Sequence, residues 1–169
     1  MGLNFSSQRS DKLIAFADAS FADKNDDRRS VSGSVISFAG GAISWFSRTQ
    51  RCVSLSTSEA EYVSMSDCLK DVLFLRRLLG FMRPSSADQK VIMYEDNEGA
   101  IRLANNPLSS LRSKHIDVRY HFIRNEVSEG RVEVKHIRTE SQRADILTKA
   151  LPLDLFVKHR NAIFGSKYN

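Results

Sequence analysis

The apolar residues of this chain form short runs, separated by longer segments in which they recur every three or four positions. One run, residues 91–97 (VIMYEDN), stops abruptly on two acids and an amide. A short apolar run bounded in this way is typical of a strand buried on both faces in the middle of a sheet. Such a strand would carry Asp96 to its C-terminal edge, where open α/β sheets place ligands. Alternatively, Glu95 and Asp96 cap the helix predicted for residues 98–105, since acids favour helix N-termini.

The other segments divide into strands and helices by their period and their terminal residues. Continuous or alternating apolar runs predict strands, and helical periodicity with capping residues and a terminal Gly or Pro predicts helices. The further predicted strands are residues 12–18, 31–38, 42–46 (with 51–55 as an extension) and 131–137, the last an edge strand. The predicted helices are residues 54–79, 98–105, 113–129, 139–151 and 153–164.

This order of elements predicts the α/β class. Three antiparallel strands followed by helix-linked strands give a mixed five-stranded sheet with helices on both faces. Because crossover connections keep their hand, the first strand and the strand at 91–97 can lie side by side and parallel, so that Asp18 and Asp96 end at one edge. A helix packed across the sheet can add Glu61 from its first turn, and the helix at 139–151 can add Asp145.

Four carboxylates gathered without a buried lysine or arginine would repel one another and raise each other's pKa. We therefore expect cations at the centre of such a cluster. Two Mg²⁺ ions, with Mn²⁺ as a substitute, would balance the four charges, because these hard ions take oxygen ligands. A pair of ions about 3.5–4 Å apart activates a water on one side and stabilises the leaving oxygen on the other, which is phosphodiester hydrolysis. The sequence has no Cys/His spacing for zinc, no glycine-rich nucleotide loop and no G-x-S-x-G motif.

The composition is that of one globular domain. The chain has 169 residues and a net charge of +5, which gives weak support to a polyanionic partner. Its two cysteines, Cys52 and Cys68, are too few for a disulfide framework, which fits a reducing compartment. No apolar run reaches membrane-spanning length, and we expect no membrane partner. We divide the chain into an N-terminal tether (1–11), a domain (12–152) and a C-terminal helical extension (153–169).

Five blocks of sequence carry a more specific signal. They are DDRRSVSGSV (26–35), SLSTSEAEY (54–62), YEDNEGAI (94–101), SKHIDVRYHFIRNEV (113–127) and RADILTKALP (143–152). In this order, and over most of residues 12–152, they resemble the ribonuclease H domain of copia-type LTR retrotransposon polyproteins. The resemblance implies the ribonuclease H-like fold and a two-metal endonuclease that cuts the RNA strand of RNA/DNA hybrids, leaving 3′-hydroxyl and 5′-phosphate ends.

The same resemblance implies a setting for the domain. It would be a monomeric piece of a larger polyprotein, would follow an upstream reverse transcriptase and would act during reverse transcription. Its location would be intracellular, in the cytoplasm within virus-like particles or in the nucleus. The alternative function is a weak or inactive nucleic-acid-binding module that keeps the fold. A third function, protein interaction, would have only the 153–169 extension as its surface, and the apolar residues there are expected to dock on the domain itself.

Carried over position by position, the resemblance implies roles for four acids. Asp18 would bridge the two metal ions, Asp96 would be the ligand from the apolar strand, and Asp145 would hold the ion on the side of the attacking water. The helix acid has two candidates, Glu59 and Glu61, which point about 200° apart on a helix and cannot both face the site. We prefer Glu61, because the family's helix acid precedes an apolar pair, and we keep Glu59 as the alternative.

Substrate recognition is expected to depend on shape and on the 2′-hydroxyl groups that mark RNA. The polar candidates for contacts with the sugars are Ser56, Thr57, Ser58 and Asn97. Helix capping explains the same residues equally well and is compatible with such contacts. Basic candidates for a phosphate track are explained nearly as well by a solvent-exposed helix face; they are Arg112, Lys114, Arg119 and Arg124.

Overall fold

The computed structural model describes residues 2–5, 12–22, 27–86, 88–105 and 114–165, apart from the side chains of 114–117 and 120. These residues form one five-stranded sheet with the strand order β3-β2-β1-β4-β5. β1 is antiparallel to β2 and parallel to β4, and β5 is parallel to β4. The strands are β1 (Ile14–Ser20), β2 (Val31–Phe38), β3 (Gly41–Thr49), β4 (Val91–Glu95) and β5 (Val132–His136). The predicted mixed sheet, with its parallel pairing of the first strand and the 91–97 strand, is confirmed.

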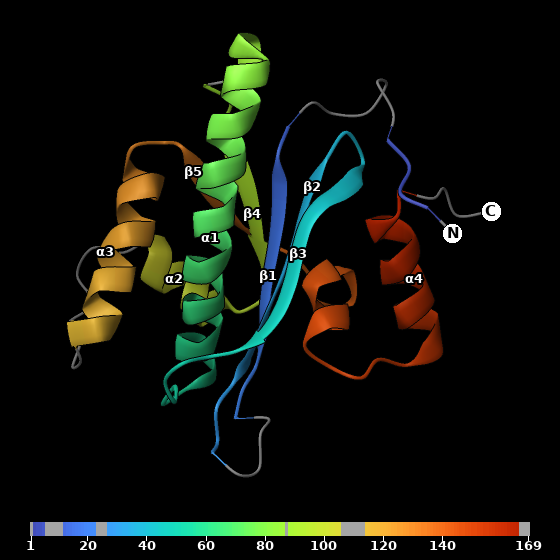
Figure 1. Cartoon of the computed structure of the whole chain (residues 1–169). Coiled ribbons are helices and arrows are strands. Elements are labelled where there is room, and N and C mark those ends of the chain that lie inside the picture. Colours follow the sequence, from blue (N-terminus) through green and yellow to red (C-terminus); the bar gives the residue numbers. More distant parts are fainter. Residues whose placement is uncertain (1, 6–11, 23–26, 87, 106–113, 166–169) are drawn as a thin grey trace.

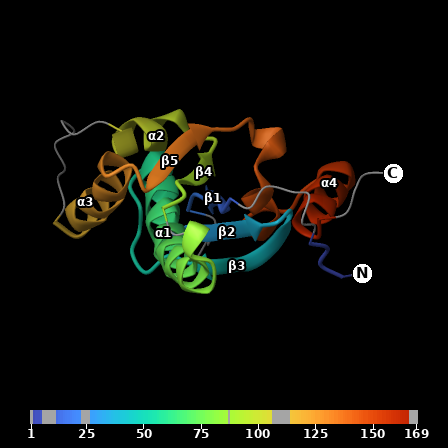
Figure 2. The same ribbon diagram turned by 90° about the horizontal axis from the view of Figure 1, so that it is seen from above.

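Helices cover both faces of this sheet, as predicted. Figures 1 and 2 show α1 (Thr57–Met82), α2 (Glu98–Asn105) and α3 (Lys114–Ser128) together on one face. The other face carries the 3₁₀ helix η3 (Arg143–Leu147) and α4 (Leu153–Ile163). Two shorter 3₁₀ helices, η1 (Pro84–Ser86) and η2 (Thr139–Ser141), lie in the connections.

An apolar core lies on each face, because successive residues of β1 point to opposite sides of the sheet. Ala15 and Ala17 belong to the core beneath α1, whereas Phe16 belongs to the core beneath η3 and α4. The ring of Phe16 stacks on that of Tyr94 from the neighbouring parallel strand, with 5.3 Å between the ring centroids. β1 is therefore buried on both faces and is the central strand of the sheet.

This arrangement corrects the prediction for the 91–97 run, which we expected to be the strand buried on both faces. β4 is an interior strand, but Ile92 and Tyr94 are only half-buried, and β4 ends at Glu95. β1 also runs two residues beyond Asp18, because Asp18 and its successors pair with β2 from Gly33 back to Val31. Asp18 therefore lies inside a strand and not at its last position.

The connection from β3 to α1 differs from the prediction, since residues 51–55 do not extend the strand. The chain leaves the sheet at Gln50, whose side chain is buried and forms three hydrogen bonds. Its Nε2 donates to Ser32 Oγ at 2.9 Å and to the Ala60 carbonyl at 2.8 Å, and its Oε1 accepts from the Ser54 hydroxyl at 2.8 Å. These bonds fix the start of α1 against the sheet. At its other end the helix continues through Gly80 to Met82.

The α-helix predicted for residues 139–151 is wrong. The segment contains η2 and η3 instead, with Gln142 between them in an extended conformation (φ −72°, ψ 102°). The buried Gln142 side chain donates to the Ala17 carbonyl at 2.8 Å and accepts from the Ala144 N–H at 3.4 Å. This side chain replaces a helical turn by a link to the central strand, and it holds η3 against the sheet.

The two ends of the described chain lie side by side (Figure 1). In the N-terminal segment 2–5, the Asn4 N–H donates to the Phe164 carbonyl at the end of α4, at 2.8 Å. The predicted helix at 153–164 is confirmed as α4, and its Ile163 packs on the core beneath η3. The rest of the predicted tether, residues 1 and 6–11, lies outside the described residues. None of the helices in the described part of the chain could cross a membrane.

The close approach of η3 to β2 predicts a stability difference between two glycine substitutions. A Cβ on Gly33 would lie 2.6 Å from Thr148 Cγ2 and 3.1 Å from the Ala144 carbonyl oxygen, whereas one on Gly2 would have nothing within 4 Å. We expect Gly33→Ala to lower the free energy of unfolding by about 1–3 kcal/mol, because overpacking displaces η3. Urea denaturation measures this, with Gly2→Ala as the control. Equal stability of the two variants would contradict the close packing.

Candidate active site

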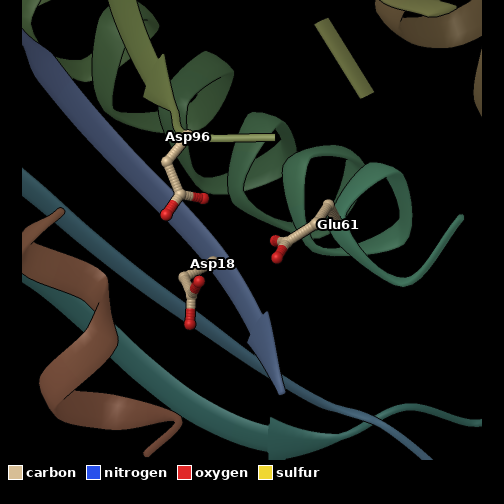
Figure 3. A group of neighbouring side chains, drawn as sticks. All are labelled: Asp18, Glu61 and Asp96. Carbon is tan, nitrogen blue, oxygen red and sulfur yellow. The ribbon is translucent and has the colours of Figure 1, made fainter. Parts of the chain in front are cut away.

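Three carboxylates from separate elements meet at one edge of the sheet. Asp18 comes from β1, Glu61 from the second turn of α1, and Asp96 from the residue after β4. One carboxylate oxygen of each lies within 4.8 Å of the others. Figure 3 shows Glu61 reaching from α1 toward the two aspartates. Asp18 is fully buried and Glu61 is 6% exposed, so two of the three charges lie in the protein interior.

The sheet itself explains this convergence. β1 and β4 pair in parallel from Ile14 with Ile92 to Phe16 with Tyr94, and the pairing stops there. Asp18 and Asp96 therefore follow the paired rows of two neighbouring strands on the same side. α1 is tied to this edge by the Ser64 hydroxyl, which lies 2.7 Å from the Asp18 carbonyl oxygen and 3.2 Å from that of Gly33. Ser64 is one helical turn from Glu61, so this contact directs Glu61 toward Asp18.

The start of α1 separates the two helix acids. Ser56 is the N-cap, and its Oγ accepts from the Glu59 N–H at 3.1 Å. The Glu59 carboxylate in turn accepts from the Leu55 N–H at 2.9 Å. This reciprocal arrangement resembles a capping box, shifted by one residue on the return bond. Glu59 thus serves the helix terminus, and Glu61 is the acid that faces Asp18 and Asp96.

The turn after β4 also divides its polar residues between capping and the site. The Glu95 Oε1 accepts from the N–H groups of Asp96 and Asn97, at 3.1 and 3.0 Å. Asn97 Oδ1 accepts from the Ala100 N–H at 3.0 Å and from the Ser58 hydroxyl at 3.0 Å. Asn97 therefore caps α2 and Glu95 holds the turn before it, while Asp96 joins the carboxylate group.

Asp145, the fourth predicted acid, is not part of that group of three. It lies in η3, on the other face of the sheet, and its Oδ1 is 3.1 Å from the Lys149 ammonium. The same ammonium is 3.1 Å from Asp18 Oδ1. The Thr148 hydroxyl donates to Asp18 Oδ2. Asp18 is thus the link between the three-carboxylate group and Asp145.

Lys149 corrects the expectation that no lysine or arginine lies among the acids. The sequence contained a signal for it, because Lys149 follows Asp145 by four residues, the spacing of a helical ion pair. The spacing does not show that the same ammonium also reaches Asp18, because that contact joins residues far apart in the chain. The fully buried Glu95 was also missed as a member of the charged cluster, since it was considered only as a helix cap.

Burial and the repulsion of neighbouring acids raise the pKa values of Glu61, Glu95 and Asp145. Burial raises the pKa of Glu61 to about 11, with further contributions from Glu95, Asp18 and Asp96. Burial likewise raises the pKa of Glu95 well above its ordinary value, although the Asn97 N–H opposes this. The pKa of Asp145 rises to about 7 through burial and the Asp18 charge, against the effect of Lys149. The site therefore holds protons at neutral pH unless another cation replaces them.

The donor set fits a hard divalent cation. The buried Oε2 atoms of Glu61 and Glu95 have no hydrogen-bond partner among the described residues. A buried unpaired carboxylate oxygen is costly, and a metal ion would satisfy it. Carboxylate oxygens are also the ligands that Mg²⁺ and Mn²⁺ prefer. Asp18, Glu61 and Asp96 could hold one such ion between them.

The predicted substrate residues occupy several different places. Ser56 and Thr57 lie exposed at the start of α1, and Ser58 donates to Asn97 beside Asp96. Arg119 of α3 forms a 2.9 Å ion pair with Asp67. It lines a polar pocket of about 200 Å³ whose other residues are Arg48, Thr49, Arg51, Asp67 and Lys70.

The other basic residues predicted to bind phosphate do not line this pocket or are not fully described. Arg124 Nε donates to the Leu103 carbonyl at 3.1 Å, which connects α3 to α2. Lys114 is the first residue of α3, but its side chain is not among those described, and Arg112 lies outside the described residues.

The sequence is similar to segments of two plant transposon proteins. It is 41% identical over 145 residues to the retrovirus-related Pol polyprotein from transposon TNT 1-94 of Nicotiana tabacum, a match that covers 85% of this chain and 11% of the relative. It is 40% identical over 139 residues to the retrovirus-related Pol polyprotein from transposon RE2 of Arabidopsis thaliana, which covers 82% of this chain and 10% of the relative. The chain thus spans about a tenth of the length of these relatives. No protein-family model matches it.

The fold is similar to that of solved ribonucleases H. LC11-RNase H1, isolated from compost by a metagenomic approach, matches with a TM-score of 0.59 and 20% identity, over 82% of this chain and 94% of that chain. The structure of LC11-RNase H1 in complex with an RNA/DNA hybrid matches with a TM-score of 0.57 and 19% identity, over 81% and 94% of the two chains. At this level of identity the likeness establishes the fold. The chain is therefore related to a segment of the retrovirus-related Pol polyproteins of transposons, and it has the ribonuclease H fold.

Proposed function

We propose that this chain is a metal-dependent endonuclease that hydrolyses the RNA strand of RNA/DNA hybrids during reverse transcription. The observation that carries the proposal is the meeting of Asp18, Glu61 and Asp96 within 4.8 Å of one another, in a ribonuclease H fold. Buried acids at this spacing are expensive without a cation, and hard cations are what phosphodiester hydrolysis requires. A protein of the same fold has been solved with an RNA/DNA hybrid bound, which supports this substrate.

In this proposal the four acids hold two Mg²⁺ ions, for which Mn²⁺ can substitute. Asp18, Glu61 and Asp96 hold one ion, and Asp18 with Asp145 holds the second. When bound, such ions activate the attacking water and stabilise the leaving oxygen. The carboxylates contribute by staying fixed on rigid elements. Thr148 and Ser64 restrain the side chain and the backbone of Asp18, and the Asn97 cap restrains the turn that carries Asp96.

The polar residues near the acids would contact the hybrid. Ser56, Thr57, Ser58 and Asn97 flank Glu61 and Asp96, where sugar hydroxyl groups would lie, since RNA is distinguished by its 2′-hydroxyls. The pocket beside Arg119 carries four basic side chains and one acid, so it is suited to a backbone phosphate. From the sequence alone, Arg112 and Lys114 are proposed as further phosphate contacts. Binding through these residues would weaken steeply as salt increases.

We further propose that the domain acts as a monomeric part of a Pol polyprotein that also contains a reverse transcriptase. The similarity to Pol polyproteins over most of the chain supports this setting. The expected location is then intracellular, in the cytoplasm within virus-like particles or in the nucleus.

Cleavage of labelled substrates tests the function directly. We expect cutting of the RNA strand of an RNA/DNA hybrid in Mg²⁺ or Mn²⁺, no cutting in EDTA, and no cutting of matched double-stranded DNA or RNA. Hybrid that is bound but uncut at every metal concentration would favour the alternative, a nucleic-acid-binding module that keeps the fold. Cleavage that persists in EDTA would contradict a metal-dependent reaction.

A pair of amide substitutions in α1 tests the site assignment. Glu61→Gln should lower cleavage by roughly a hundredfold or more, since even loss of a residue that supports a metal ligand costs 10–100-fold. Glu59→Gln is the matched control, because it makes the same chemical change two residues away, at the helix cap. It should leave cleavage nearly unchanged and lower stability slightly. If Glu59→Gln is the inactive variant, the assignment of Glu61 is wrong.

Metal affinity should depend on pH in a defined direction. Burial and neighbouring acids raise the pKa of Glu61 to about 11 and that of Asp145 to about 7, so both acids hold protons that an ion must displace. Apparent Mg²⁺ affinity should therefore increase as pH rises through 7 and continue to increase toward 9. Without metal, the folded protein keeps protons on these acids that the unfolded chain releases at the ordinary carboxyl pKa. The free energy of unfolding should therefore decrease as pH rises above that ordinary pKa.

Titration calorimetry at pH 6, 7, 8 and 9 measures how the Mg²⁺ affinity depends on pH. Denaturant unfolding in EDTA over the same range measures how the stability of the metal-free protein depends on pH. An Asp145→Asn variant should lose the part of the dependence near pH 7. An affinity that does not change between pH 6 and 9 would show that these acids are already ionised without metal.

A further inference from the structure

Lys149 lies between two acids to which the proposed function assigns a metal ion. Its ammonium nitrogen is 3.1 Å from Asp18 Oδ1 and 3.1 Å from Asp145 Oδ1. The backbone fixes this position, because the Lys149 N–H donates to the Asp145 carbonyl at 3.0 Å and so forms one helical turn. The two carboxylates are almost fully buried, whereas the lysine side chain is 35% exposed.

The ammonium group and a metal ion cannot share this position. Mg²⁺ binds carboxylate oxygens at about 2.0–2.1 Å, so an ion held by both acids would lie where the ammonium nitrogen now bridges them. Oδ2 of Asp18 accepts from the Thr148 hydroxyl, whereas the buried Oδ1 has no hydrogen-bond partner among the described residues and is balanced only by the ion pair with Lys149. An ion that binds Oδ1 of both Asp18 and Asp145 must therefore displace the ammonium group of Lys149.

We infer that Lys149 is an exchangeable counter-ion, which fills the cation position between Asp18 and Asp145 in the metal-free protein and leaves it when a divalent ion binds there. This inference rests on the proposed function for the identity of the incoming ion. The lysine is suited to exchange, because its flexible stem carries a compact charge that gains hydration when it moves out. Its partly exposed side chain gives that charge a path to solvent.

Two unequal metal positions follow from this exchange. An ion held by Asp18, Glu61 and Asp96 relieves the repulsion among three acids without breaking an ion pair of Glu61 or Asp96 in the described structure. An ion between Asp18 and Asp145 must break both contacts of Lys149. We therefore expect the second ion to bind more weakly, and its affinity to be set by the charge at position 149.

Metal titration without nucleic acid tests the inference on the whole chain. Lys149→Met removes the charge and keeps the length of the side chain, and Lys149→Arg keeps the charge. Lys70→Met is the matched control, since it removes an equal charge from an exposed 2.8 Å ion pair with Asp67 on α1. The measurements are the Mn²⁺ dissociation constants from calorimetry of the metal-free proteins and the melting temperature of each in EDTA.

The expected result is a change confined to Lys149→Met. The dissociation constant of its weaker Mn²⁺ site should be roughly tenfold lower than in Lys70→Met, which corresponds to about 1.4 kcal/mol of binding free energy. Its melting temperature in EDTA should also fall below that of the control, because Asp18 and Asp145 lose their shared counter-ion. Lys149→Arg should bind the second ion no more tightly than the wild type does.

Two results would overturn the inference. Mn²⁺ constants for Lys149→Met that match those of Lys70→Met would show that Lys149 does not compete with the ion. Weaker Mn²⁺ binding by Lys149→Met would show that the lysine supports the metal site instead. Neither measurement involves cleavage. A tighter second Mn²⁺ site in Lys149→Met, together with a wild-type chain that cuts no hybrid, would support the inference and reject the nuclease function. A wild-type chain that cuts the hybrid, together with unchanged Mn²⁺ binding in Lys149→Met, would reject only the inference.

Discussion

Repulsion between buried carboxylates is the interaction that the rest of this structure has to accommodate. Carboxylate oxygens of Asp18, Glu61 and Asp96 lie within 4.8 Å of one another, and the charge of the fully buried Glu95 also acts on Glu61. The charged form of Glu61 is disfavoured twice, by burial and by the neighbouring charges, which raises its pKa to about 11. A fold that keeps these side chains together must supply either protons or cations. Lys149 supplies one positive charge, and burial alone would lower its pKa, but Asp18 and Asp145 outweigh that effect and raise it.

The acids stay together because polar side chains fasten the elements that carry them to the central strand. Ser64 attaches α1 to the backbone of β1 and β2, and Gln142 attaches the segment before η3 to the Ala17 carbonyl. Gln50 fixes the start of α1 from the end of β3. Each of these side chains is buried and hydrogen-bonded, so loss of one would leave partners unsatisfied. The rigidity that the proposed metal binding would need thus comes from links between the sheet and the elements on its two faces.

The sequence predicted the sheet, the parallel pairing of its two acid-bearing strands and the position of α1, because these depend on apolar periodicity and on caps. It did not predict the 3₁₀ helices at 139–147, because the helical pattern there is overridden by the tertiary hydrogen bonds of Gln142. The choice between Glu59 and Glu61 also required the fold. Both residues have capping spacing in sequence, and only the packing of α1 on β1 shows which carboxylate faces Asp18.

Lys149 was hidden for a similar reason. Its spacing from Asp145 was visible, but its contact with Asp18 joins residues far apart in the chain, and that contact arises only when η3 packs on β2 at Gly33. Sequence pattern therefore identifies which acids are present and at which strand ends. The number of charges that the site must balance depends on tertiary packing.

Anomalous diffraction from crystals of the chain grown with Mn²⁺ would show directly whether the three clustered carboxylates hold a metal ion. We expect an anomalous peak in contact with the carboxylates of Asp18, Glu61 and Asp96. Mn²⁺ bound only elsewhere on the molecule, with these three carboxylates in contact with no ion, would contradict it.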